Sequence, residues 1–234
     1  MQKYFLKRKK ISDALHHIYE YPMTLAVAAM GYGKSTATRD FLEESKAKYV
    51  WLSVESDESS PKYIWDVFAR KLSKFKPEIG EKLRLLGFPM DTPQKEKVLR
   101  IIEEHNFGNN IIVVIDDYHF VHSPEMDQFF EYLVNSKIER LHILILTRTV
   151  PQIAIDEFIL KGFCHLISSE LFEMSIDEII DFFSLCGYDV TKDMAQKVYD
   201  LSEGCVSAVY LLLKSYEEIG EFGSGSSIER LIET

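Results

Sequence analysis

The segment Ala28-Ala-Met-Gly-Tyr-Gly-Lys-Ser35 has the residue types of a loop that binds phosphate groups. It fits the pattern G-x-x-x-x-G-K-[ST], with alanine in place of the first glycine. In such a loop the backbone N–H groups and the positive end of the following helix face the phosphates of a nucleotide. A methyl group at Ala28 is tolerated where φ is negative, and Gly31 and Gly33 keep the positions nearest the phosphates. The segment therefore predicts a nucleotide-binding P-loop, the Walker A motif.

Within this loop we expect Lys34 to reach the β- and γ-phosphates of ATP and to assist catalysis. The hydroxyl group of Ser35 is expected to bind Mg²⁺, which prefers oxygen ligands, and Thr36 to lie near the α-phosphate. The expected nucleotide contacts are Gly31, Tyr32, Gly33, Lys34, Ser35 and Thr36. The alternative is a helix that begins with Gly-Lys-Ser by chance, and a second motif argues against it.

The second motif is a run of β-branched residues, Ile111 to Ile115, that ends in Asp116 and Asp117. Such a run is typical of a strand buried on both faces of a parallel sheet, and a carboxylate at its end has the place of a Walker B aspartate. We expect Asp116 to hold a magnesium-bound water and Asp117 to orient the attacking water as a catalytic residue. The competing interpretation is an ordinary exit from a strand into a loop.

Arg148 follows another apolar run, Leu141 to Leu146, and is the third catalytic candidate because it could sense the γ-phosphate. The competing interpretation is an ion pair with Asp116 or Asp117. His119 lies two residues after Asp117 and is more simply a loop histidine.

These residues need a sheet to position them, and the hydrophobic pattern predicts one. Strands are expected at 23–28, 49–54, 111–115, 141–146 and 163–167, and helices at 12–19, 34–46, 61–75, 92–106 and from 124 onward. This alternation predicts an α/β fold, a P-loop NTPase with a five-stranded, mainly parallel sheet flanked by helices. From the capping box at Ser175 the pattern is helical only, which predicts a small helical lid. The expected division is 1–170, the nucleotide-binding domain; 171–219, the lid; and 220–234, a flexible tail.

Composition limits the function classes. The chain has 234 residues and a net charge of −10. This negative charge disfavours binding of a polyanion such as nucleic acid over a broad surface. Its apolar runs are far shorter than the ~20 residues that span a bilayer, and its first residues lack a signal peptide, so we expect a cytoplasmic protein. The three cysteines form no C-x-x-C pair, which favours buried thiols over disulfides or a zinc site.

Five segments together resemble one family: Ala29-Met-Gly-Tyr-Gly-Lys-Ser35, Val50-Trp-Leu-Ser53, Val114-Ile-Asp-Asp-Tyr-His119, Leu146-Thr-Arg-Thr-Val-Pro-Gln152 and Ser202-Glu-Gly-Cys-Val-Ser-Ala208. In this order they resemble the nucleotide-binding domain of the STAND ATPases. More narrowly, they are similar to the N-terminal domain of the large ATP-dependent LuxR-type transcription regulators typified by the activator of the maltose regulon.

The resemblance implies that the Arg148 strand lies between the P-loop strand and the Asp116 strand. It implies a slow Mg²⁺-dependent ATPase in which the ADP form rests and the ATP form self-associates, with DNA read by a C-terminal helix-turn-helix that this chain lacks. By the same resemblance, Arg8 lies in a segment that meets the adenine. The family's lid motif often ends in Gly-x-Pro, where this chain has Gly204-Cys-Val206.

Two functions remain open on the sequence alone. One is the regulatory switch just described. The other is a dedicated P-loop enzyme, such as a small-molecule kinase with Asp117 as the base. Such kinases usually carry arginines in the lid, and residues 175–219 contain none, which favours the switch.

Overall fold

A computed structural model describes residues 6–55, 60–104, 109–121 and 123–219. The chain divides into two compact units. The sheet unit comprises Asp13–Val27 and Thr38–Ile167. The helical unit has as its described parts residues 6–12, 28–37 and 168–219. The P-loop therefore belongs to the same unit as the C-terminal helices. The division at 170 and 219 expected from the sequence stays a prediction, and the tail at 220–234 lies outside the described residues.

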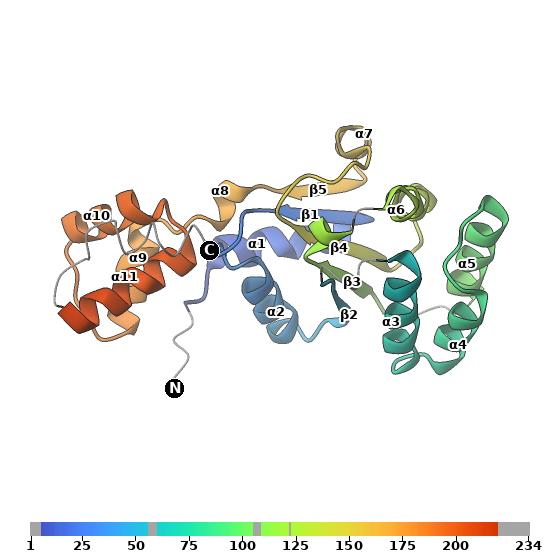
Figure 1. The fold of residues 1–234 in the computed structure, drawn as a ribbon, viewed down its shortest axis with the longest axis horizontal. Coiled ribbons are helices and arrows are strands. Elements are labelled where there is room, and N and C mark those ends of the chain that lie inside the picture. Colours follow the sequence, from blue (N-terminus) through green and yellow to red (C-terminus); the bar gives the residue numbers. More distant parts are fainter. Residues whose placement is uncertain (1–5, 56–59, 105–108, 122, 220–234) are drawn as a thin grey trace. The chain divides into compact units, whose positions relative to one another are not determined.

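The sheet has five strands, all parallel (Figure 1). Their bounds are β1 Met23–Val27, β2 Lys48–Ser53, β3 Ile111–Asp116, β4 Leu141–Thr147 and β5 Cys164–Ile167. The strand order is β2-β3-β4-β1-β5, so β4, which leads to Arg148, lies between β1 and β3 as the resemblance implied. The predicted five-stranded α/β fold is confirmed.

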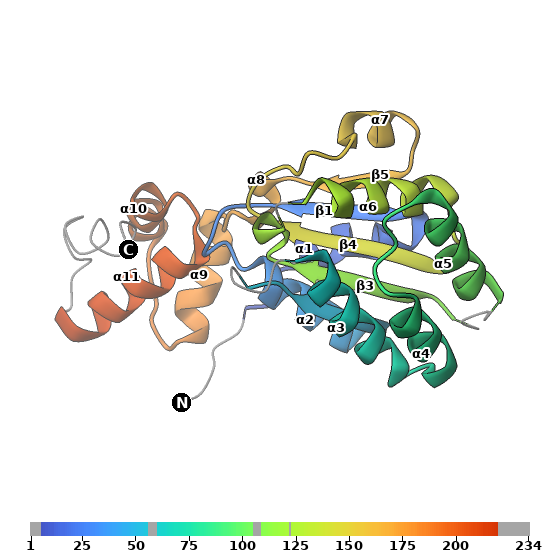
Figure 2. The same cartoon turned by 45° about the vertical axis from the view of Figure 1, so that its right-hand side comes forward.

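One face of the sheet packs on a layer of helices. These are α3 Pro61–Ser73, α4 Pro77–Leu86, α5 Thr92–Glu104, α6 Pro124–Ser136 and α7 Ile155–Leu160, and Figure 2 shows α3 to α6 grouped beside the strands. Leu25, Val113 and Ile143 project from neighbouring strands into the same core as Trp65 of α3 and Phe129 of α6. Alternate residues of a strand face opposite sides, so this layer covers one face.

The other face of the sheet carries buried apolar residues, among them Ile112, Val114 and Leu144, together with aromatic and polar ones. The 3₁₀ helix η1 (His17–Glu20) follows α1 (Lys9–His16), and Tyr19 stacks edge-on against His142 of β4. The guanidinium of Arg39, in α2 (Lys34–Glu44), lies 3.8 Å from the centroid of the Trp51 ring in β2. Both faces of the sheet are therefore covered, as the apolar runs of β3 and β4 require.

The helical unit has a core of its own. Its C-terminal helices are α8 Ser169–Phe172, α9 Ile176–Leu185, α10 Lys192–Ser202 and α11 Val206–Ile219. Ile179, Phe183, Val198 and Leu212 are fully buried together at its centre. At the start of α9 the predicted capping box is present, with both reciprocal bonds between Ser175 and Glu178.

Several expected bounds differ from the structure. Helix α1 begins at Lys9, three residues before the expected start, and α4, α7 and α8 were not expected at all. Helices α7 and α8 are only six and four residues long, which leaves too few turns for a helical period to show. Of the three cysteines, Cys164 is buried as expected, whereas Cys186 and Cys205 are only half-buried. No helix among the described residues is long and apolar enough to cross a membrane.

Candidate functional site

The P-loop begins where β1 ends, at Val27, and continues into α2 at Lys34. Gly31 has a φ of +86° and Gly33 a φ of +81°. This left-handed region is open to glycine at little cost and disfavours residues with a Cβ. The two glycines that the sequence analysis placed nearest the phosphates are thus required by the backbone path of the loop.

The start of α2 supplies donors. The first helical bond runs from the Ala37 N–H to the Gly33 carbonyl, at 2.9 Å. The N–H groups of Lys34, Ser35 and Thr36 therefore have no acceptor inside the helix, which is the general condition for binding an anion at a helix start. The Lys34 side chain is 8% exposed, and its ammonium donates to the carbonyl oxygens of Ala28 and Ala29.

The loop packs directly on the first turn of α11 in the same unit. The Ser207 N–H donates to the Gly31 carbonyl at 3.0 Å. A Cβ added to Gly31 would lie 3.0 Å from the sulfur of Cys205, and one added to Gly33 would lie 3.6 Å from a methyl of Val206. The residues that replace the family's Gly-x-Pro motif are therefore P-loop contacts. The sequence did not predict that Cys205 and Ser207 contact the loop, because neither residue type indicates such a contact.

Tyr32 projects from the loop toward the same helices. Burial is the main cause that raises the pKa of its hydroxyl, and the nearby Cys205, Glu173 and Glu203 raise it further. Tyr32 therefore stays a neutral phenol at neutral pH. As a nucleotide contact it remains a prediction.

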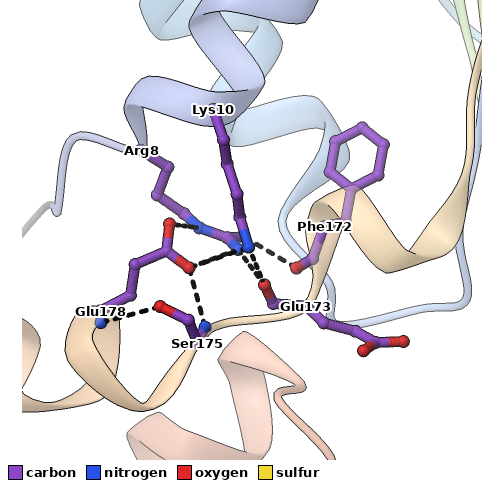
Figure 3. Close-up of polar contacts among 6 residues, drawn as sticks. All are labelled: Arg8, Lys10, Phe172, Glu173, Ser175 and Glu178. Atoms are coloured by element: carbon purple, nitrogen blue, oxygen red, sulfur yellow. Dashed lines mark hydrogen bonds and ion pairs between the residues drawn. The ribbon is translucent and has the colours of Figure 1, made fainter.

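Arg8 is bound by the start of α9 (Figure 3). Its Nε donates to Glu178 Oε1 at 3.1 Å, and its two terminal nitrogens donate to the carbonyls of Phe172 and Glu173 at 2.8 and 2.6 Å. The Lys10 ammonium lies 3.1 Å from Glu178 Oε2. Burial alone would raise the pKa of the Glu178 carboxyl, but the bonds from Arg8, the Ser175 N–H and Lys10 outweigh it and lower that pKa. The residues of this cluster, which we call the Arg8 clasp, are Arg8, Lys10, Phe172, Glu173, Ser175 and Glu178.

The clasp gives Arg8 a structural role that the sequence did not reveal. Its guanidinium side chain is only 7% exposed and most of its donors are used within the unit. A contact of Arg8 with adenine stays a prediction. The capping box signalled the position of Glu178, but its pairing with a residue 170 positions away has no local signature.

In the sheet unit, the two aspartates at the end of β3 differ in environment. Asp116 is 6% exposed, whereas the side chain of Asp117 is 41% exposed. Asp117 has a φ of +58°, a conformation that aspartate tolerates better than most residues, and its N–H donates to Asp116 Oδ1 at 3.1 Å. The left-handed turn separates a buried carboxylate from an exposed one. It also places His119 Nδ1 3.7 Å from Asp117 Oδ1.

Arg148 is exposed at the first position after β4. Within the described chain it forms no ion pair with Asp116 or Asp117, and its guanidinium lies 5.9 Å from the centroid of the Phe120 ring. The side chain is therefore not held by the carboxylates that the competing interpretation named. In the sheet register Val27 of β1 pairs with Thr147 of β4, and Ser53 of β2 pairs with Asp116 of β3. The carboxyl ends of these strands therefore lie at the same end of the sheet.

Among the described residues, no three His, Cys, Asp or Glu side chains gather into a group that could hold a metal ion by themselves. A divalent cation at the P-loop would therefore need oxygens from a nucleotide as well as from the protein, which is how Mg²⁺ is usually held beside phosphates.

Relatives were found by sequence, although no protein-family model matches the chain. The chain is 21% identical to the HTH-type transcriptional regulator MalT of Vibrio cholerae over 208 residues, which is 88% of this chain and 23% of that protein. It is 22% identical to MalT of Yersinia pestis over 218 residues, and 24% identical over 143 residues to the serine/threonine-protein kinase PknK of Mycobacterium tuberculosis. The chain thus spans about a quarter of the MalT proteins that it matches.

Solved structures agree on the architecture. A Walker-type ATPase of Pyrococcus abyssi superposes with a TM-score of 0.58 at 18% identity, over 97% of this chain and 70% of that one. The fold is that of a P-loop ATPase. The Orc1 protein of Aeropyrum pernix, solved with DNA, superposes with a TM-score of 0.55 at 13% identity, over 91% of this chain and 59% of that one.

This fold accounts for the order of motifs along the chain. In this chain the glycine-rich loop follows β1 and Asp116 ends β3, the places where the sequence analysis expected the Walker A and Walker B motifs. The roles of these residues stay predictions. The resemblance to LuxR-type regulators of the MalT type, stated from five short segments, is confirmed by the MalT matches. The structural neighbours confirm the P-loop fold, and the narrower STAND assignment stays a prediction.

Proposed function

We propose that this chain is the ATP-binding, slowly ATP-hydrolysing switch domain of a LuxR-type transcription regulator. The observation that carries the proposal is the P-loop itself: two glycines at positive φ followed by Lys34 and Ser35 at the start of a helix. Backbone N–H groups in such a glycine turn before a helix form a concave site that suits an anion such as phosphate. MalT is named as a transcriptional regulator, and its similarity extends over 88% of this chain.

The loop fits the phosphates of ATP or ADP. A Cβ at Gly31 would crowd Cys205 and Ser207 of the same unit, so the close approach to α11 requires glycine there. At Gly33 a Cβ would make an ordinary contact with Val206, and it is the positive φ that favours glycine. Lys34 carries its ammonium back over the loop, where it now donates to two loop carbonyls. We propose that phosphate oxygens replace these two carbonyls as acceptors for the Lys34 ammonium. Residues 31–36 would contribute their backbone N–H groups as further donors.

Ser35 and Asp116 are the proposed magnesium ligands, directly or through water. When bound, Mg²⁺ neutralises charge on the phosphate oxygens. The burial of Asp116 supports this assignment, because a buried carboxylate is stabilised by a cation. The exposure of Asp117 suits a residue that orients water, which must come from solvent.

Arg148 is the proposed reader of nucleotide state. ATP and ADP differ by one phosphate, and a ligand shifts a conformational equilibrium only through contacts that differ between the two states. Arg148 ends a core strand, is exposed and is not tied to a described carboxylate, so its long side chain can turn toward an additional anion. We propose that ATP-dependent self-association in the full-length regulator depends on this contact, and that DNA is bound by another domain.

The test compares wild type with Arg148→Ala by small-angle scattering, each with ADP and with a non-hydrolysable ATP analogue. The wild type should change shape or self-associate with the analogue alone, and Arg148→Ala should bind ADP normally and lose that change. Arg100→Ala, which removes an exposed arginine of α5 in the sheet unit, is the control. If Arg148→Ala keeps the full response to the analogue, nucleotide state is read elsewhere and this part of the proposal is wrong.

A further inference from the structure

A pocket of about 190 Å³ lies between the end of β2 and α3 in the sheet unit. Strand β2 is at the edge of the sheet. The pocket wall combines apolar side chains with two hydroxyls and two cations: Leu52, Ser53, Val54, Tyr63, Ile64, Val67, Arg70 and Lys71. No residue of the P-loop belongs to this wall, and the pocket adjoins the end of β3, where Ser53 pairs in register with Asp116.

Positive charge is concentrated beside the pocket. The Lys71 ammonium donates to the Trp51 carbonyl at 2.5 Å, which fixes it against β2. Arg39 stacks on the ring of the same tryptophan, 3.8 Å from its centroid. Burial lowers the pKa of Lys71, and repulsion from Lys74, Arg70 and Arg39 lowers it further. Four cations therefore act on one another within a small region.

No described carboxylate compensates these charges. Along the described chain, Arg39, Arg70, Lys71 and Lys74 form no ion pair, although the protein carries ten more acidic than basic residues. Like charges held close together raise the energy of a fold unless an anion joins them. An edge-capping role explains Lys71 alone, because lysines often protect edge strands, but it does not explain the other three cations.

We propose that this pocket binds a small organic phosphate ester, with the phosphate at Arg70 and Lys71 and the carbon part against Val54 and Val67. An arginine and a lysine give a phosphate both hydrogen bonds and charge, and hydroxyl groups such as those of Ser53 and Tyr63 can add neutral donors. The apolar wall favours an ester over free phosphate because its carbon atoms leave water on binding. The volume admits one small ligand rather than a nucleotide or a polymer.

The experiment uses butyl phosphate as the probe and follows the backbone amide signals of the whole chain by NMR titration. It is done on the Lys34→Ala background, so that the P-loop does not compete for the phosphate. The variants are Arg70→Gln, which changes an exposed side chain, and Lys71→Met, which keeps the length of the buried stem. Lys97→Gln removes one exposed cation from α5, outside the pocket wall, and is the matched control.

Butyl phosphate should shift the amide signals of residues 52–54 and 63–71 and bind several-fold more tightly than inorganic phosphate. Arg70→Gln and Lys71→Met should each weaken binding at least about tenfold, the effect expected for one charge-assisted hydrogen bond, and Lys97→Gln should not. The proposal is overturned if the probe causes no shifts there at about 50 mM, or if Arg70→Gln binds as tightly as the control. Equal affinity for butyl phosphate and inorganic phosphate would refute the claim that the pocket prefers an organic ester. Failure of ADP to bind the wild type would bear on the P-loop alone.

Discussion

At the scale of single residues, Gly31 meets two requirements at once. Its φ of +86° disfavours a side chain, and its α-carbon lies so close to α11 that a Cβ would come within 3.1 Å of both Cys205 and Ser207. Gly87, at the end of α4, has a φ of +71°, but a Cβ added there would meet no atom within 4 Å, so it meets only the first requirement. Comparing variants at Gly31 and Gly87 therefore separates the cost of backbone strain from the cost of crowding α11.

We expect Gly31→Ala to lower the free energy of unfolding of the chain by more than Gly87→Ala does, and to weaken ADP binding, which Gly87→Ala should leave unchanged. Backbone strain costs about 1–3 kcal/mol at either position, and displacement of α11 adds to it at Gly31 only. Urea unfolding and ADP titration of both variants measure this. Equal losses at the two positions would mean that contact between the loop and α11 contributes nothing.

The places of the candidate site residues in the fold could be predicted because each follows an apolar strand, and their chemical roles stay predictions. Asp116 ends β3, Arg148 comes directly after β4, and Lys34 and Ser35 begin the helix that follows β1. Arg8 was named as a candidate site residue only through the resemblance to a known family. Its partners Phe172, Glu173 and Glu178 lie more than 160 residues away, and pairing at that distance depends on the packing of the whole unit.

At the scale of elements, the start of α9 serves as a helix cap and as the anchor of the Arg8 clasp. Ser175 Oγ accepts the Glu178 N–H at 3.2 Å, and the Glu178 carboxylate accepts the Ser175 N–H at 2.9 Å while it pairs with Arg8. Glutamine at 178 can still accept the Ser175 N–H, but it carries no charge for Arg8. The two roles of Glu178 can therefore be separated.

Ser175→Ala should lower the free energy of unfolding by about 0.5–2 kcal/mol, the usual loss of an N-cap. Glu178→Gln should lower it by about 1.5–3 kcal/mol, because the Arg8 guanidinium, 7% exposed, loses its charged partner. Chemical denaturation of both variants gives the comparison. Raising the salt concentration should change the loss in Ser175→Ala little. A Glu178→Gln variant as stable as wild type would show that the clasp is energetically neutral.

Helix starts were predicted well where a capping residue or a proline at the first helical position precedes an amphipathic segment, as at Pro61, Pro124 and Ser175. Helix α4 was missed although Pro77 begins it and Gly87 ends it, because only Ile79, Gly80 and Leu83 are buried in its ten residues. Three inward positions give a weak period. The helix exists because it packs on α3, where Gly80 admits the backbone of Ala69, and sequence alone does not show that contact.

At the scale of the whole molecule, two histidines make stability depend on pH. Burial lowers the pKa of His142 below 6.5, against a weaker opposite effect of its bond to the Tyr21 carbonyl. Burial and the charge of His17 lower that of His165. At these two positions the unfolded chain therefore binds more protons than the folded one below about pH 6.5, so their contribution to the free energy of unfolding falls as pH decreases through that range.

His142→Asn should reduce this pH dependence, since it removes one of the two groups. His16→Asn is the matched control, because His16 is exposed and acts on neither His142 nor His165. Urea unfolding at a series of pH values from about 8 to 5 gives the slopes for the three proteins. An unchanged slope in His142→Asn would mean that this histidine is protonated in the folded chain as readily as in the unfolded one.

The central claim is that the P-loop binds ATP or ADP, and calorimetric titration of the intact chain with each nucleotide and Mg²⁺ tests it most directly. Lys34→Ala should bind about 10- to 150-fold more weakly than wild type, because a charge-assisted hydrogen bond contributes about 1.5–3 kcal/mol. Lys62→Ala, which removes an exposed lysine of α3, should bind as wild type does. Equal nucleotide affinity in wild type and Lys34→Ala, or no binding by the wild type, would contradict the account.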